Sequence, residues 1–398
     1  CIRDRHRAYT MALEAGNPFL AAAALELVAG VQVYHQGRLR AAVQSLRQIL
    51  DLGTDPDGAK LPFSATAHAL LAEVYLEWND LDAARFYLEE GVGLQRQGGI
   101  AHGLTHTFCT KARLARAEGD RWAAFDALQS AKQALAALPM WHIIVHLSAC
   151  HTRLSLWLGD VEAAARWAAA DAACIGDGLP EKLPGYLREV QQLSMARVYL
   201  ARGEIEETLA LMDLVIQDAE PTGRLAHAIE AHLLTALALS ARGKNGQAIQ
   251  SLARSISLAE PRGYKRLYLE VGEPIPFLLK EVRASAQAYD TGFMHGEPRL
   301  LLAYVETLLA AFADSGAELS PPRTGKRLTR AQGLAEPLTP REEQVLRLID
   351  KGYTNQEISE MLVVSLNTVK KHASGIYGKL NVHSRTQAVA RAREEGLI

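Results

Sequence analysis

Apolar residues recur along most of the chain at the three- and four-residue spacing of amphipathic helices, and short polar or glycine-containing turns separate these stretches. The long N-terminal part shows no convincing alternation of apolar and polar positions of the kind that marks strands. The pattern therefore predicts an all-α protein.

A turn followed by a small residue recurs six times along the chain. The small residues lie at intervals of 42, 40, 40, 44 and 40: Ala42, Ala84, Ala124, Ala164, Thr208 and Ala248. A period of this size, made of helix, tight turn and helix, is typical of an α-solenoid, in which each hairpin buries its apolar face against its neighbours. We therefore expect a superhelical array of helical hairpins. The units resemble tetratricopeptide repeats with a lengthened period, and HEAT-like packing is the alternative.

Composition agrees with this picture. With 398 residues, 48% of them apolar, and a net charge of -2, the chain is globular and long enough for more than one domain. It has neither a run of about 18 apolar residues, the length of a membrane helix, nor a paired CxxC motif. We expect a cytoplasmic protein without disulfides and without a membrane contact. Because the chain begins at Cys1 and not at Met, we also expect it to be part of a longer protein.

Charge is distributed unevenly. Residues 321–398 carry 13 Lys+Arg against 8 Asp+Glu, whereas residues 1–320 carry 30 against 37. Such an asymmetry indicates a nucleic-acid contact at the basic end. A Pro-, Gly- and Arg-containing stretch with little apolar periodicity precedes that end. We predict a repeat domain at 1–314, a linker at 315–337 and a DNA-binding domain at 338–398.

The third and fourth hairpins share a finer pattern. Three residues recur at an interval of 40: His102, His106 and Arg113, then His142, His146 and Arg153. Spacings of four and seven place each set on one helical face. The tetratricopeptide resemblance implies that His106, Arg113, His146 and Arg153 face the concave groove, where they suit an anionic or hydroxyl-rich ligand or an acidic peptide. The alternative is a set of duplicated, ordinary solvated polar positions.

Other chemistry finds little support in the sequence. His142, His146 and Cys150 have a spacing that metal ligands can use, but no HExxH motif or carboxylate accompanies them. The chain also lacks a GxxxxGK[ST] phosphate loop and a compact nucleophile–base motif. We predict no metal site, no catalytic residues and no cofactor in this chain.

The C-terminal region carries the sharpest pattern. Four helix starts can be read from capping residues at Thr339, Thr354, Ser365 and Ser384. The expected inward residues are Val345, Leu348, Ile349, Ile358, Met361, Leu362, Val369, Ile376, Leu380, Ala388, Val389 and Ala392. The second and third helices, joined by a brief step, predict a helix-turn-helix whose later helix enters the DNA major groove. Residues 365–385 contain no Asp or Glu, as a phosphate-facing surface requires.

These residues closely resemble the LuxR-type helix-turn-helix. The matching motifs are Leu338-Thr339-Pro340-Arg341-Glu342, Thr354-Asn355-Gln356-Glu357-Ile358, Thr368-Val369-Lys370-Lys371-His372 and Ile376-Tyr377-Gly378-Lys379-Leu380. By position, the resemblance implies base contacts from Lys370, Lys371 and Ser374, and phosphate contacts from Thr368, His372, Lys379 and Arg385. It also implies paired half-sites and a dimer face on the fourth helix. Gly375 departs from the larger residues common at its position and is expected to weaken the helix.

A helical-repeat body with such a tail is similar to the large MalT-type LuxR regulators. That resemblance implies an inducer-sensing array, an ATP-binding module upstream of this chain, a homo-oligomer on double-stranded DNA, and activation through RNA polymerase. The alternative is a scaffold whose groove takes a peptide or a partner protein.

Overall fold

The structure is a computed structural model that describes residues 2–97, 101–135, 141–169, 183–288, 298–315, 338–362, 364–395 and 397. Within these residues the regular secondary structure is helical, apart from one isolated bridge between Thr54 and Lys60. The all-α prediction is confirmed.

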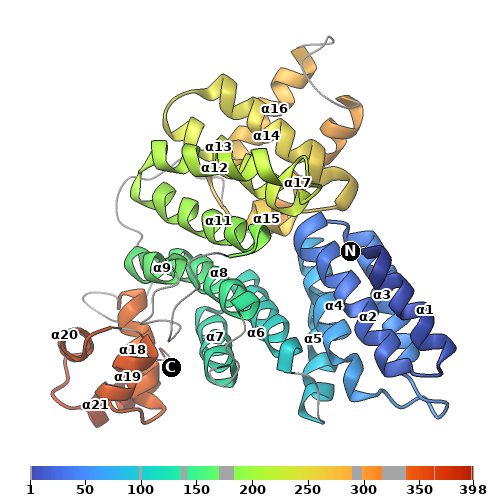
Figure 1. The fold of residues 1–398 in the computed structure, drawn as a ribbon. Coiled ribbons are helices and arrows are strands. Elements are labelled where there is room, and N and C mark those ends of the chain that lie inside the picture. Colours follow the sequence, from blue (N-terminus) through green and yellow to red (C-terminus); the bar gives the residue numbers. More distant parts are fainter. Residues whose placement is uncertain are drawn as a thin grey trace.

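The repeat domain is a succession of antiparallel helix pairs (Figure 1). The pairs are α2 (Pro18–Val31) with α3 (Leu39–Leu52), α4 (Ala65–Glu77) with α5 (Leu81–Arg96), α6 (Ala101–Ala117) with α7 (Arg121–Leu135), α8 (Trp141–Trp157) with α9 (Val161–Ala168), α11 (Gly185–Arg202) with α12 (Ile205–Ala219), α13 (Leu225–Ala241) with α14 (Asn245–Ala259), and α16 (Pro274–Ala288) with α17 (Pro298–Asp314). The remaining helices are α1 (Ile2–Glu14), α15 (Arg266–Leu269) and the short turns η1 (Gln32–Gln36), η2 (Pro62–Ser64) and η3 (Glu260–Arg262).

The recurring turn has one backbone geometry. In each of the six turns, the residue two places before the second helix of the pair has a left-handed backbone conformation, with φ between 62° and 81°. These residues are Gly37, Asn79, Gly119, Gly159, Gly203 and Gly243. The six small residues that follow are each 0% exposed. Because the paired helices touch at these positions, a larger side chain would force them apart. The spacing of small residues is therefore a packing requirement of the array.

The array closes on itself. The indole Nε1 of Trp78, after α4, donates to the carbonyl of Arg262 at 2.9 Å, and the backbone N–H of Lys265 donates to the carbonyl of Glu77 at 2.9 Å. On the same side, η1 contacts α13, and one hydrophobic core joins α2, α3 and α4 to α11 through α17. Figure 1 shows the blue N-terminal helices lying against the region of α15 and α17. The first helices of the pairs thus surround a central space.

The C-terminal domain consists of α18 (Pro340–Asp350), α19 (Asn355–Leu362), α20 (Leu366–Lys379) and α21 (Arg385–Glu394). The predicted caps are confirmed, since the side chains of Thr339, Thr354, Ser365 and Ser384 each accept a hydrogen bond from the backbone N–H three residues later. Ten of the twelve expected inward residues are buried, and Met361 and Val389 are partly buried against the same core. The capping pattern therefore predicted all four helices.

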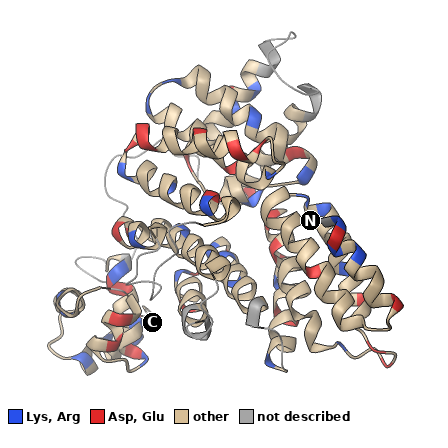
Figure 2. Ribbon diagram, in the orientation of Figure 1, with Lys and Arg blue, Asp and Glu red and all other residues tan. Residues whose placement is uncertain are grey.

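The predicted linker at 315–337 falls outside the described residues except for Ser315. One described helix, α2 continued by η1 over Pro18–Gln36, is long and apolar enough to span a membrane by length and composition. Its Ala21, Leu25 and Val28 are buried in the hairpin packing, which is the position of a core helix. Charges of both signs are spread over the helices of the array (Figure 2).

Candidate functional site

The helix expected to read DNA, α20, presents a basic exposed face. Its N-cap Ser365 fixes the start of the helix, and the buried Val369, Ala373 and Ile376 fix which side faces the domain core. The three residues predicted to contact base edges, Lys370, Lys371 and Ser374, are all exposed. Thr368 and His372 are only half-buried. The helix can therefore enter a major groove with its lysines leading.

Lys379 and Arg385 are engaged within the domain. The Nζ of Lys379 lies 2.8 Å from Oε2 of Glu342, and the guanidinium of Arg385 donates to the carbonyls of Ile349, at 3.2 Å, and Tyr353. These contacts tie α20 and α21 to α18. The structure thus gives both cations a positioning role, and their contact with phosphate stays a prediction.

The presence of glycine at position 375 has a steric explanation. A Cβ at this position would lie 2.6 Å from Oε1 of Glu342. The same carboxylate accepts the backbone N–H of Thr339 at 2.7 Å and also binds Lys379, so two contacts hold it in place. The glycine that departs from the family pattern makes room for this buried carboxylate.

The four predicted groove residues of the repeat domain line one cavity. His106 and Arg113 on α6, and His146 and Arg153 on α8, all border a central cavity of about 140 Å³. The same cavity is bordered by η1, α4, α11, α13 and α15, the helices that ring closure brings together. A second cavity of about 280 Å³ shares Tyr34, Thr105, His106 and His146 with the first. His102 falls where the side chains are not described.

The two arginines are held by carboxylates of other helices of the array. Arg113 Nη2 lies 2.5 Å from Glu77 Oε1 and 3.1 Å from Glu270 Oε1. Arg153 Nη2 lies 2.5 Å from Glu230 Oε2, and the other oxygen of Glu230 is 2.8 Å from Arg197 Nε. The first set of ion pairs joins α4, α6 and the end of α15, and the second set joins α8, α11 and α13 across the inner surface.

The pKa values follow from these contacts. Burial disfavours the charge on Glu230, but the guanidiniums of Arg153 and Arg197 outweigh it and lower the pKa of this carboxyl to about 2. Burial raises the pKa of Glu73 to about 7, because Arg113 offsets the lost hydration only in part. Burial, reinforced by His227, lowers the pKa of His35 to about 3. Near neutral pH the central cavity therefore presents a carboxyl that titrates, Glu73, and the second cavity presents a neutral imidazole, His35.

Several cavity residues escaped sequence reasoning. Tyr34 stacks on His106 with ring centroids 5.0 Å apart and lies edge-on to His146 at 5.2 Å. It belongs to η1, a π-helical turn of the kind that often occurs at functional sites. The hydroxyl of Thr105, whose residue is 3% exposed, borders both cavities and has no hydrogen-bond partner among the described residues. The repeat pattern carried no signal for these positions, because they come from unlike places in different hairpins.

The comparisons with known proteins agree with this architecture. The family model described as "MalT-like TPR region" matches residues 4–285, from α1 into α16. This chain belongs to the MalT-like TPR family. The family model "Bacterial regulatory proteins, luxR family" matches residues 336–392 and so covers the C-terminal domain.

MalT-like relatives align along most of the chain. A protein named "HTH-type transcriptional regulator MalT" from Yersinia pestis (strain Pestoides F) is 26% identical over 370 residues, covering 90% of this chain and 39% of the relative. The protein of the same name from Vibrio cholerae serotype O1 is 23% identical over 366 residues, with the same shares covered. The chain thus spans about two fifths of the length of these relatives.

The histidines and cysteines of α6 and α8 do not form a metal site among the described residues. Among the described residues, no group of three His, Cys, Asp or Glu side chains is arranged to hold a metal ion. His142 and His146 are instead linked through the backbone, since His146 Nδ1 lies 2.7 Å from the carbonyl oxygen of His142. Cys109 and Cys150 face each other across α6 and α8, with Cys150 Sγ 3.8 Å from the Cys109 carbonyl oxygen.

Proposed function

We propose that this chain is the sensing and DNA-binding part of a bacterial transcription regulator, with α20 reading operator DNA and the repeat array binding an inducer. The observation that carries the proposal is the exposed row of Lys370, Lys371 and Ser374 on a capped helix whose core follows the LuxR pattern. Membership of the MalT-like family supports the same combination of a helical array with a DNA-binding domain. We expect the protein to act in the cytoplasm, where operator DNA is accessible.

For the inducer we propose a compact, hydroxyl-rich molecule. The central cavity is lined by Tyr34 and His106, which contact each other, by His146, and by Thr105, whose hydroxyl has no hydrogen-bond partner among the described residues. The guanidiniums of Arg113 and Arg153 are paired with carboxylates. An anionic ligand would have to displace those ion pairs, which makes a neutral polar ligand the better fit. A peptide along the inner surface, the alternative, would need more room than the two cavities give.

We further propose that DNA binding is dimeric, with α21 as the dimer face, and that the intact regulator activates transcription through RNA polymerase. Two DNA-binding domains that each bind weakly, when held in one homo-oligomer, bind paired half-sites far more tightly than either domain does alone. The modest net charge of residues 338–398, with 9 basic and 7 acidic residues, supports a need for such avidity. An ATP-binding module upstream would drive the assembly.

The test is selection of sites from random duplex DNA by this chain, at two salt concentrations. The matched control is the Lys370→Ala/Lys371→Ala variant, whose exposed substitutions leave the core intact. Enrichment of a paired motif that the control fails to select supports sequence-specific regulation. Equal, unselective and steeply salt-dependent binding by both proteins contradicts the roles given to Lys370 and Lys371.

A thermal-shift screen tests the sensing half of the proposal. Neutral polyols, small anions and acidic peptides are compared for their ability to raise the melting temperature of the wild type and of His106→Leu. Stabilisation by a neutral polyol that is lost in the variant supports the compact ligand. Stabilisation by peptides alone favours the scaffold alternative.

A further inference from the structure

The C-terminal domain is seated on the repeat domain. Phe125 of α7 is 7% exposed and belongs to the same hydrophobic cluster as the core of the C-terminal domain, with Trp122 packed beside it. Gln129, one turn further along α7, donates from Nε2 to the carbonyl of Met361 at 2.8 Å. Figure 1 shows the red C-terminal helices beside α7 and α9.

Lys351 adds a charged contact to the same surface. Its Nζ lies 2.9 Å from Oδ1 of Asp126 and 4.6 Å from the centre of the Trp122 ring. The ammonium at the end of α18 is therefore held by a carboxylate and by an aromatic face of α7 at once. Both charged side chains keep more than two fifths of their surface exposed, so the pair can separate without stranding a buried charge.

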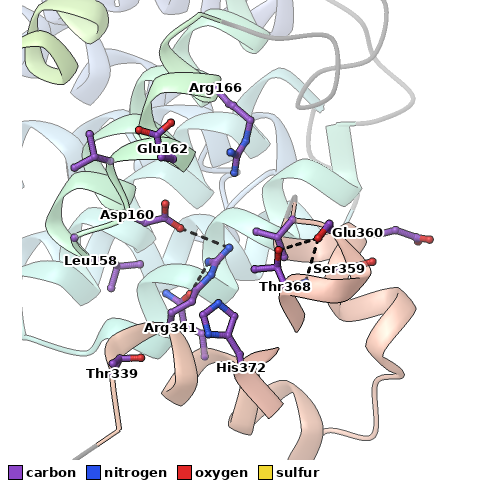
Figure 3. A pocket seen from close by; sticks show the side chains of 15 residues that line it. Leu158, Asp160, Glu162, Arg166, Thr339, Arg341, Ser359, Glu360, Thr368 and His372 are labelled. Atoms are coloured by element: carbon purple, nitrogen blue, oxygen red, sulfur yellow. Dashed lines mark hydrogen bonds and ion pairs between the residues drawn. The ribbon is translucent and has the colours of Figure 1, made fainter. Parts of the chain in front are cut away.

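A second contact lies at the turn between α8 and α9. Arg341 Nη2 is 3.6 Å from Oδ2 of Asp160, and a groove of about 1200 Å³ separates this turn from α19 and the start of α20. Figure 3 shows Arg341 reaching towards Asp160, with His372 beside it and Thr368 on the same wall. Burial and the Arg341 guanidinium lower the pKa of His372, as expected for an imidazole enclosed next to a cation.

If Thr368 and His372 hold phosphates, as the resemblance implies, a DNA backbone bound to α20 passes along this groove. Thr368 and His372, the two half-buried residues expected to hold phosphates, face the acidic turn that carries Asp160 and Glu162. The residues expected to read bases, Lys370, Lys371 and Ser374, do not line the groove and are exposed. A duplex bound to α20 would bring its phosphates against the carboxylates of that turn, so docking and DNA binding compete for one edge of the helix.

We propose that α7 and the α8–α9 turn form an autoinhibitory surface whose partner is the DNA-binding domain of the same chain, docked through Trp122, Phe125, Asp126 and Asp160. This proposal rests on the DNA-binding function proposed above and adds its regulation. The helices that form the surface also reach the cavity: α8 carries His146 and Arg153 to its wall and ends at the turn that holds Asp160. A ligand that moves α8 therefore acts on the docking surface directly.

The proposal is tested with the full chain, its labelled selected site, and a random-sequence duplex of equal length where selection yields no site. The undocking variant is Trp122→Ala/Asp126→Lys. Its matched control is Trp141→Ala/Asp82→Lys, because Trp141 is 51% exposed at the far end of α8 and the Asp82 side chain is 95% exposed on α5. Both variants lose one indole and gain the same charge, so their difference reports docking alone.

We expect the undocking variant to bind the duplex about tenfold more tightly than its control, the gain obtained when a docked state favoured about ten to one is abolished. Adding Lys351→Asp to Asp126→Lys restores an oppositely charged pair and should return the affinity towards that of the wild type. Hydrogen exchange provides a readout without DNA, in which amides of α7 lose protection in the undocking variant and regain it in the restored pair.

Equal affinities of the undocking and control variants, or unchanged exchange of α7, would overturn the autoinhibitory surface. The failure of the proposed function looks different. In that case no variant binds DNA better than Lys370→Ala/Lys371→Ala does, whatever happens to the exchange of α7.

Discussion

The ammonium of Lys379 lies 2.8 Å from the carboxylate of Glu342, and this contact fixes the carboxylate directly above Gly375. One acidic side chain thereby closes the N-terminal capping box of α18, anchors the end of α20 and limits position 375 to glycine. The helix that we propose reads DNA is positioned by a buried charge in the domain core.

Gly375→Ala should destabilise the C-terminal domain although alanine is the better helix former. The new Cβ would crowd a carboxylate that cannot move freely, and overpacking of this kind costs about 1–3 kcal/mol. The matched control is Gly378→Ala, where a Cβ meets no atom within 4 Å and the change should stabilise α20 by up to about 1 kcal/mol. Urea denaturation followed by circular dichroism gives both values. Equal stabilisation by the two substitutions would contradict the account of Glu342.

Thr105→Val should stabilise the repeat domain, because it replaces a buried hydroxyl that has no partner among the described residues. Removing such a group relieves a desolvation cost of about 1–3 kcal/mol. Thr107→Val is the matched control on the same helix, since the Thr107 hydroxyl is equally buried but donates to the carbonyl of Gly103 at 2.9 Å. Melting temperatures without ligand compare them, and a loss of stability in both variants would mean that Thr105 has a partner.

Glu73→Gln should flatten part of the pH dependence of stability. The folded protein raises the pKa of Glu73 from its ordinary value of 4.5 to about 7. The folded state therefore holds the proton more tightly, so stability from this group is complete below pH 4.5 and is lost as the pH rises through 7. The variant should match the wild type near pH 5 and exceed it by about 2–3 kcal/mol at pH 8. Thermal melts across this range measure the difference.

The control for this prediction is Glu273→Gln, which removes an exposed carboxylate outside the cavity. It should change the melting temperature at pH 8 far less than Glu73→Gln does. A Glu73→Gln curve parallel to that of the wild type would show that Glu73 is ionised throughout.

Glu230→Gln should be strongly destabilising, because it leaves the guanidiniums of Arg153 and Arg197 buried without their shared carboxylate. Breaking a buried pair by removing one partner costs about 3–5 kcal/mol. Glu206→Gln is the comparison, since it removes the exposed partner of Arg242 and should cost less than about 1 kcal/mol. Chemical denaturation of the full chain distinguishes the two, and a similar small loss in both would show that the inner ion pairs contribute little.

Local features were the ones that sequence could predict. Ala42 and its five equivalents mark where paired helices touch, and Thr339, Thr354, Ser365 and Ser384 mark helix starts, because such positions depend only on residues a few places away. The inward side of each C-terminal helix followed from the same periodicity. These signals repeat, so they can be recognised without knowledge of the fold.

Contacts between distant hairpins were not predictable in this way. Glu230 and Glu270 lie 77 and 157 residues from the arginines that they bind, and nothing in the repeat marks them as partners. The contacts of Lys351 with Trp122 and Asp126 likewise depend on how the two domains pack against each other. From the sequence, Gly375 was expected only to weaken the helix. The structure shows that a larger residue at this position would collide with the Glu342 carboxylate.

The contact of Trp78 with Arg262 makes the number of hairpins in this array a fixed quantity. Open solenoids can lengthen or shorten by gain or loss of a repeat unit, since each unit touches only its neighbours. In a closed ring the same event would pull the two ends apart and expose the core that they share. Evolution of this protein is therefore expected to proceed by substitution inside hairpins, and homologues that keep the Trp78 contact should keep its repeat count.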